Sequence, residues 1–150
     1  MAIGPAKYNE LYEKFRNLNS LLAWGHARAI ENVLEQCPAT KVISDEFAKG
    51  GFAVKKALFE KGKSLEFISA VRAEQDIAVA AASILARAEF LTRLKRLGEE
   101  FGQTLPKGAS NVVEPAVKFV QKHGAERLSE VAKMHFKTSQ QVIERAGASR

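Results

Sequence analysis

The chain has 150 residues, of which 46% are hydrophobic and 27% are charged, and its formal net charge is +6. These values are typical of a single soluble globular domain over residues 1–150. Cys37 is the only cysteine, which excludes an internal disulfide and predicts a reducing, cytoplasmic location. No apolar run approaches the roughly 20 residues that cross a bilayer, and the N-terminus lacks the pattern of a secretory signal, so no membrane partner is expected. The excess of lysine and arginine is compatible with a polyanionic partner. Because these residues are dispersed along the chain, most of them are more simply interpreted as side chains on solvated helix faces.

The first half of the chain is predicted to alternate between helices and short strands. Apolar periodicity predicts helices at 8–16 and 20–36, with Asn17 or Asn19 as the N-cap of the second. A β-branched strand is expected at 40–44, a helix at 52–62 and a second, alternating strand at 64–71.

The second half of the chain is predicted to be helical. A long helix is expected at roughly 75–97, because apolar residues recur there at helical spacing. These residues are Ile77, Ala80, Ala81, Ile84, Ala88, Leu91 and Leu94. A loop at 102–110 precedes a helix at 112–123, for which Asn111 and Glu114 resemble a capping box. Further helices are expected at 125–136 and over the tail from residue 138, which then frays.

Two acidic residues follow the two predicted strands. A strand, a helix and a strand form a βαβ unit, whose right-handed crossover makes the strands parallel and predicts an α/β fold. Asp45 and Glu74 then lie at the carboxyl end of the sheet, where open α/β folds place ligands. Neighbouring strands lie about 4.8 Å apart, so these carboxylates could share a divalent cation.

Each of these two acids also has a purely structural interpretation. Asp45 could cap the helix that follows it, because aspartate is a favoured N-cap residue. Glu74 could lie in the first turn of the long helix and interact with its macrodipole. Spacing alone favours these interpretations for each residue, and the metal hypothesis depends on the pair.

Several blocks of the sequence resemble one family in matching order. They are YNELYEKFRNLNSLLAWGHARAIENVLE, VISDEFA, AEQDIAVAAASILARAEFL, LPKGAS and VAKMHF. Together they resemble the C-terminal portion of bacterial ribonuclease HIII, of the type 2 ribonuclease H group. This resemblance implies a ribonuclease H-like α/β fold that lacks its N-terminal strands, with a parallel βαβ unit surrounded by helices.

The resemblance also implies an activity and a set of site residues. The family is a group of metal-dependent hydrolases that cleave the RNA strand of RNA–DNA hybrids with Mg²⁺ or Mn²⁺, held by four carboxylates in the order Asp, Glu, Asp, Glu. By motif, Asp45 matches the third acid and Glu74 the fourth, as catalytic metal ligands. Ser83 and Arg87 lie in a block that contacts the site or substrate in related enzymes, and Lys107 could reach a phosphate. The simpler interpretations are a small packing residue for Ser83 and surface cations for Arg87 and Lys107.

The sequence departs from the family's pattern at its beginning. The early strand with the first Asp-Glu pair has no counterpart here, nor have the other N-terminal strands, the glycine-rich loop or the N-terminal substrate-binding domain. We therefore expect a truncated enzyme whose two acids hold one cation more readily than two. The alternative function is a catalytically inactive or complementation-dependent fragment that binds nucleic acid, with a complementing chain as partner. A helical DNA-binding module ranks last, because residues 125–136 lack helix-turn-helix spacing.

Overall fold

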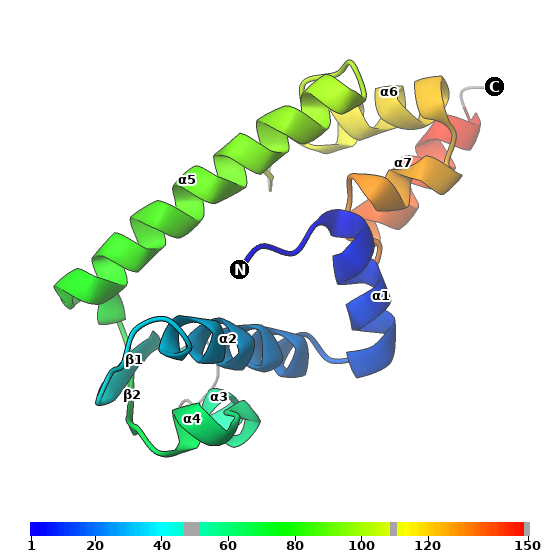
Figure 1. Ribbon diagram of the computed structural model, residues 1–150. Helices are drawn as coiled ribbons and strands as arrows, with labels where there is room; N and C mark the ends of the chain where they lie inside the picture. Colours follow the sequence, from blue (N-terminus) through cyan, green and yellow to red (C-terminus); the bar gives the residue numbers. More distant parts are fainter. Residues whose placement is uncertain (47–51, 109–110, 149–150) are drawn as a thin grey trace. The chain divides into compact units, whose positions relative to one another are not determined.

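The chain forms two compact units in the computed structural model, which describes residues 1–46, 52–108 and 111–148 (Figure 1). The first unit comprises Phe15–Arg87 together with Met1, and the second comprises Ala2–Lys14 together with Ala88–Arg150. The long helix α5, Ile77–Glu100, contributes its first half to the first unit and its second half to the second. Within the described ranges, no helix is both long enough and apolar enough to span a membrane.

The first unit contains the predicted parallel strands. Its elements are α2 (Leu18–Leu34), β1 (Lys41–Asp45), α3 (Phe52–Ala57), α4 (Glu60–Lys63), β2 (Glu66–Ala70), the 3₁₀ turn η2 (Ala73–Gln75) and the start of α5. β1 and β2 pair in parallel, with Lys41 opposite Glu66 and Asp45 opposite Ala70 (Figure 1). The predicted α/β fold with a parallel βαβ unit is therefore confirmed.

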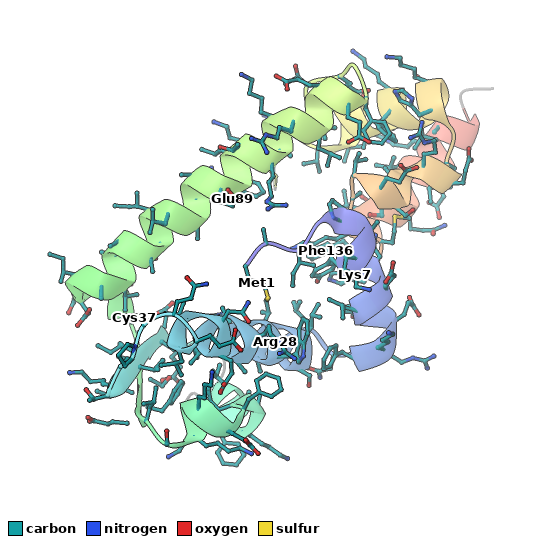
Figure 2. The ribbon with its side chains drawn as sticks, in the orientation of Figure 1. Met1, Lys7, Arg28, Cys37, Glu89 and Phe136 are labelled. Atoms are coloured by element: carbon teal, nitrogen blue, oxygen red, sulfur yellow. The ribbon has the colours of Figure 1, made fainter. Side chains whose placement is uncertain are left out.

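Helix α2 is held at both ends of its length by side-chain hydrogen bonds. At its start, the Asn17 side chain accepts a hydrogen bond from the Ser20 amide at 2.9 Å, which confirms one of the two predicted N-caps. Near its end, the buried Glu31 carboxylate accepts a hydrogen bond from the Gly62 amide at 2.6 Å. Arg28, which Figure 2 shows on α2, places its guanidinium 4.5 Å from the centre of the Phe59 ring. These contacts fasten α2 to the segment that contains α4.

The predicted helix over 52–62 is wrong, because the segment forms two short helices. α3 ends at Ala57 and α4 begins at Glu60, with Phe59 in an extended conformation between them. In a continuous helix, the Gly62 amide would bond to the carbonyl of Leu58, four residues earlier. Here that amide donates to the Glu31 carboxylate instead. A tertiary hydrogen bond thus replaces the local one.

The second unit is helical. Besides α1 (Pro5–Phe15, up to Lys14) and the second half of α5, it contains α6 (Val113–His123), η3 (Glu126–Glu130) and α7 (Lys137–Ala148). Its core lies where α6 and α7 pack together (Figure 1). The buried core residues are Phe101, Val117, Phe119, Val120, Leu128, Val142 and Ala146. The helical prediction for the tail is confirmed by α7.

The predicted helix over 125–136 is wrong, because only the 3₁₀ turn η3 forms there. The reason lies in Asn9 of α1, far away in sequence. Its Nδ2 donates to the carbonyls of Ser129 and Ala132, both at 2.9 Å, and its Oδ1 accepts from the Met134 amide at 3.0 Å. These backbone groups would otherwise be available for helical hydrogen bonds, so a distant side chain decides the local backbone.

The ends of α5 and α6 also differ from the predictions. α6 begins after Val112, whose side chain makes no capping hydrogen bond, so the predicted capping box is wrong. Glu114 instead forms an ion pair of 3.1 Å with Arg145 of α7. α5 extends to Glu100 and ends in a Schellman motif. In this motif Gly102 has a φ of +59° and the Gln103 amide donates to the Gly98 carbonyl at 2.9 Å.

Candidate functional site

The carboxyl end of the parallel strands carries the first predicted site residue, Asp45. Asp45 is the last residue of β1, and its Oδ1 accepts a hydrogen bond from the Ala73 amide at 3.2 Å. Ala73 is buried and begins η2, directly after Arg72, which reverses the chain in the left-handed conformation with φ +58°. Glu74 is the next residue, so the hydrogen bond from the Ala73 amide to Asp45 holds the turn that contains Glu74.

The second predicted site residue, Glu74, lies in η2 with its side chain exposed. α5 begins only at Ile77, so the alternative that placed Glu74 in the first turn of this helix is wrong. Asp76 takes the capping role, because its Oδ1 accepts from the Ala78 amide and its carbonyl accepts from Ala80, both at 2.9 Å. Glu74 is thereby left outside the helix.

The capping alternative for Asp45 stays a prediction, because residues 47–51, between Asp45 and α3, lie outside the described residues. The carboxylate of Asp45 is bonded to the β2–α5 connection through the Ala73 amide. Both acids therefore belong to one end of the sheet within the first unit.

The donor chemistry of this pair suits a hard divalent cation. Carboxylate oxygens are preferred ligands of Mg²⁺ and Mn²⁺, and Mg²⁺ sites commonly use one or two carboxylates together with water and substrate phosphates. Among the described residues, no group of three or more His, Cys, Asp or Glu side chains is placed to hold a metal. That Asp45 and Glu74 together hold a cation stays a prediction.

Ser83 and Arg87 lie one turn apart on the first half of α5. Both side chains are exposed, and their spacing of four residues places them on the same side of the helix. They belong to the same unit as Asp45 and Glu74. Their roles toward a substrate stay predictions.

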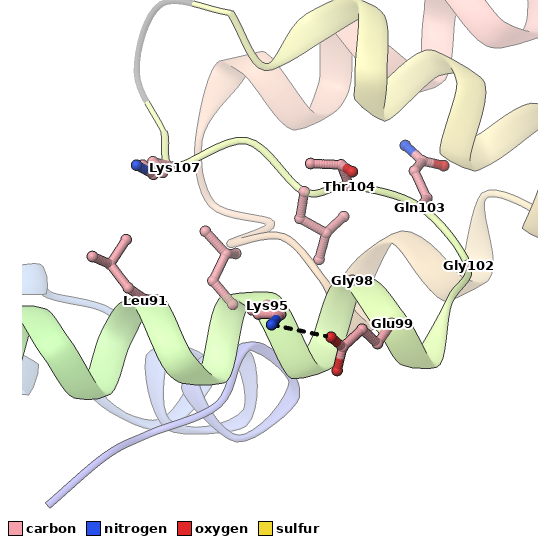
Figure 3. A pocket seen from close by; sticks show the side chains of 10 residues that line it. Leu91, Lys95, Gly98, Glu99, Gly102, Gln103, Thr104 and Lys107 are labelled. Atoms are coloured by element: carbon pink, nitrogen blue, oxygen red, sulfur yellow. Dashed lines mark ion pairs between the residues drawn. The ribbon is translucent and has the colours of Figure 1, made fainter.

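Lys107 lies in the loop that follows α5, in the second unit. It is exposed and lines a cavity of about 500 Å³ together with Leu91, Lys95, Gly98 and Glu99 (Figure 3). An ion pair of 3.8 Å joins Lys95 to Glu99 along this cavity (Figure 3). A role of Lys107 at a phosphate stays a prediction.

Two features of the site escape sequence reasoning to different degrees. The capping role of Asp76 has a readable signal, since an aspartate directly precedes the apolar run from Ile77. The bond between Asp45 and the Ala73 amide has none, because it joins positions that are distant in sequence.

The chain is similar to known ribonucleases along nearly its whole length. The family described as Ribonuclease HII matches residues 4–139. Ribonuclease HIII of Chlamydia caviae is 46% identical over 99% of this chain and 50% of that protein. Ribonuclease HIII of Protochlamydia amoebophila is 47% identical over 97% of this chain and 48% of that protein. The chain thus spans about half the length of these relatives.

Solved structures agree with this similarity. The crystal structure of Bst-RNase HIII in complex with Mn²⁺ matches with a TM-score of 0.85 and 26% identity, over 99% of this chain and 50% of that one. A mutant form of Bst-RNase HIII matches with a TM-score of 0.84 and 27% identity, over 97% of this chain and 49% of that one. The chain therefore belongs to the ribonuclease HII family and corresponds to a C-terminal portion of the relatives named ribonuclease HIII.

Proposed function

We propose that this chain carries half of the active site of an endonuclease that cleaves the RNA strand of RNA–DNA hybrids. The observation that carries the proposal is the hydrogen bond between Asp45 and Ala73, which ties the end of β1 to the turn with Glu74. Membership of the ribonuclease HII family supports the reaction type. Similarity to an RNase HIII that was crystallised with Mn²⁺ supports a divalent cation, Mg²⁺ or Mn²⁺, as cofactor.

Asp45 and Glu74 are the proposed metal ligands and catalytic residues. The Ala73 amide holds Asp45 through Oδ1, which orients the carboxylate and leaves Oδ2 for a cation. A bound divalent cation supplies charge stabilisation at the phosphate and lowers the pKa of a bound water. The capping role of Asp76 helps indirectly, because it fixes where α5 begins and so keeps η2 short.

Ser83, Arg87 and Lys107 are the proposed substrate contacts. A guanidinium group binds phosphate oxygens in a bidentate manner, which suits Arg87 for the hybrid backbone. The Ser83 hydroxyl can both donate and accept a hydrogen bond, as a 2′-hydroxyl does. Contacts to 2′-hydroxyl groups would select RNA, because DNA does not offer them. Lys107 would add a point charge toward a phosphate.

The second candidate function is a fragment that binds nucleic acid but cleaves only when another chain completes it. Two observations favour it. The described residues contain no group of three or more His, Cys, Asp or Glu side chains that could hold a metal, and the chain spans about half of its relatives. Two-metal hydrolysis needs carboxylates that hold both ions. On this proposal, the purified chain binds one Mn²⁺ weakly and leaves a hybrid uncut. For either candidate, we propose a cytoplasmic location, which the lone Cys37 supports.

The test combines Mn²⁺ binding with cleavage of a labelled RNA–DNA hybrid. Asp45→Asn and Glu74→Gln should both lose Mn²⁺ binding. Glu66→Gln is the matched control, because Glu66 is an exposed acid at the opposite end of β2 and should bind Mn²⁺ like the wild type.

The outcome separates the two candidates. Cleavage by the chain alone that disappears in Asp45→Asn supports the nuclease. Salt-dependent hybrid binding and Mn²⁺ binding without cleavage support the fragment. If the control loses Mn²⁺ binding as strongly as Asp45→Asn and Glu74→Gln, the proposed site is wrong.

A further inference from the structure

The first half of α5 exposes large apolar side chains to solvent. Ile77 is 87% exposed, Ile84 is 70% exposed and Leu85 is 71% exposed. Over residues 77–86 the only polar side chain is Ser83, and the other side chains are alanine or larger apolar groups. A helix that is apolar nearly all round is typical of a protein interior. Apolar side chains that gather on one surface indicate a surface that another polypeptide covers.

These apolar side chains share one side of the helix. Ile77, Ala81 and Ile84 repeat at intervals of four and three residues, and Leu85 adjoins them one turn after Ala81. We call this set the α5 apolar face. Ser83 lies outside it in the helical repeat, whereas Arg87 adjoins Ile84 three residues further along. A partner on the α5 apolar face would therefore leave Ser83 uncovered.

The sheet of the same unit is also incomplete by itself. Among the described residues it has two strands, so β1 and β2 each have one edge without a neighbouring strand. Ile43 and Ile68 are opposite one another in the register and are only half-buried. Isolated two-stranded sheets are marginally stable in water, and unpaired edges accept further strands. The unit thus offers both an apolar helix face and strand edges.

We propose that the α5 apolar face is the docking surface for the part of the ribonuclease HIII fold that this chain does not span. The chain matches the fold of Bst-RNase HIII with a TM-score of 0.85 over 99% of its own length, but it covers only 50% of that chain. The rest of that fold therefore has the size to cover exposed parts of this half. This inference rests on the complementing chain of the proposed function and names the surface that receives it.

A second copy of this chain is a less suitable occupant. Two copies would bring together chains that each carry a formal net charge of +6, which opposes association. A second copy would also bring the same two strands rather than the missing half of the fold. Self-association through the α5 apolar face is therefore an outcome that would overturn the proposal.

The experiment co-expresses this chain with a tagged polypeptide that comprises the half of Protochlamydia amoebophila ribonuclease HIII that the chain does not match. The test variants are Ile84→Glu and Leu85→Glu, which place a charge on the α5 apolar face. Val33→Glu is the matched control, because Val33 is 60% exposed on α2 of the same unit. Circular dichroism checks that each variant folds, as expected for substitutions at exposed positions.

Wild type and Val33→Glu should copurify with the tagged polypeptide in a 1:1 complex, as measured by light scattering. Ile84→Glu and Leu85→Glu, while folded, should each reduce the copurified amount at least tenfold. Hydrogen exchange over residues 77–86 should be at least tenfold slower in the complex than in the chain alone. The proposal is overturned by the absence of a complex, by a complex that both variants retain, or by a homodimer that Ile84→Glu dissociates.

Because the readout is binding, this test can fail separately from the proposed nuclease function. A complex that depends on Ile84 but does not cleave a hybrid with Mn²⁺ supports the docking surface and contradicts the nuclease. Cleavage by a complex that Ile84→Glu and Leu85→Glu leave intact supports the nuclease and overturns the docking surface.

Discussion

Asn9 is the residue whose loss should have the clearest structural consequence. Its side chain makes three hydrogen bonds, to the Ser129 carbonyl, the Ala132 carbonyl and the Met134 amide. Each such bond contributes roughly 1 kcal/mol net, so Asn9→Ala should lower the free energy of unfolding by about 3 kcal/mol. That is a large fraction of the roughly 5–15 kcal/mol typical of a domain.

Urea denaturation of Asn9→Ala measures this loss. Asn32→Ala is the control, because Asn32 is exposed on α2 and its replacement should change stability by less than about 0.5 kcal/mol. Hydrogen exchange of the Met134 amide gives a local readout and should accelerate in Asn9→Ala, because its acceptor is removed. A variant within about 0.5 kcal/mol of wild type, with an unchanged Met134 amide, would refute the role of Asn9.

Three further substitutions test the packing, the pH dependence and the site. Gly98→Ala places a Cβ 2.7 Å from a backbone oxygen of the following loop. Urea denaturation should therefore show that the free energy of unfolding falls by about 1–3 kcal/mol. Gly147→Ala is the control and should be nearly neutral, because no atom lies within 4 Å of the added Cβ. Burial among aromatic rings, together with the positive charge of a neighbouring lysine, lowers the pKa of His135 below its ordinary 6.5. As the pH falls, this histidine is therefore protonated in the unfolded chain before it is protonated in the folded one. The free energy of unfolding should keep its full value above about pH 6.5 and fall at lower pH. His135→Phe should flatten that decline between pH 8 and pH 5, and an unchanged slope would contradict this cause. Asp45→Ala should lower the free energy of unfolding by about 1 kcal/mol through loss of the Ala73 bond, while Asp45→Asn keeps an acceptor and should stay near wild type. Equal stability of the two variants would show that the bond contributes nothing.

Local patterns in the sequence identified several elements correctly. The β-branched run at 40–44 and the alternating run at 64–71 became β1 and β2, and the chirality of βαβ crossovers correctly predicted that they pair in parallel. Asn17 caps α2 as expected, because an N-cap bonds an amide only a few residues away. These predictions hold because their causes lie within a few residues of each element.

Two of the wrong predictions share one physical cause. The Glu31 carboxylate accepts a hydrogen bond from the Gly62 amide, and the helix expected at 52–62 is interrupted. The Asn9 side chain donates hydrogen bonds to the carbonyls of Ser129 and Ala132 and so prevents a helix at 125–136. In both places a buried or half-buried side chain from a distant element competes with the local backbone hydrogen bond. No spacing rule for a single segment contains that partner.

The site shows the same division between sequence and tertiary structure. The sequence by itself determined the family, through blocks that match in order, and it identified Asp45 and Glu74 as acids that follow two strands. Only the tertiary structure decided that Asp45 bonds to Ala73, and that Asp76 rather than Glu74 caps α5. It also decided that Ile84 is exposed, although its periodicity is that of a buried face. The periodicity of apolar residues indicates which side of a helix is suited to burial. Whether that side is buried depends on which other segments of polypeptide are present to pack against it.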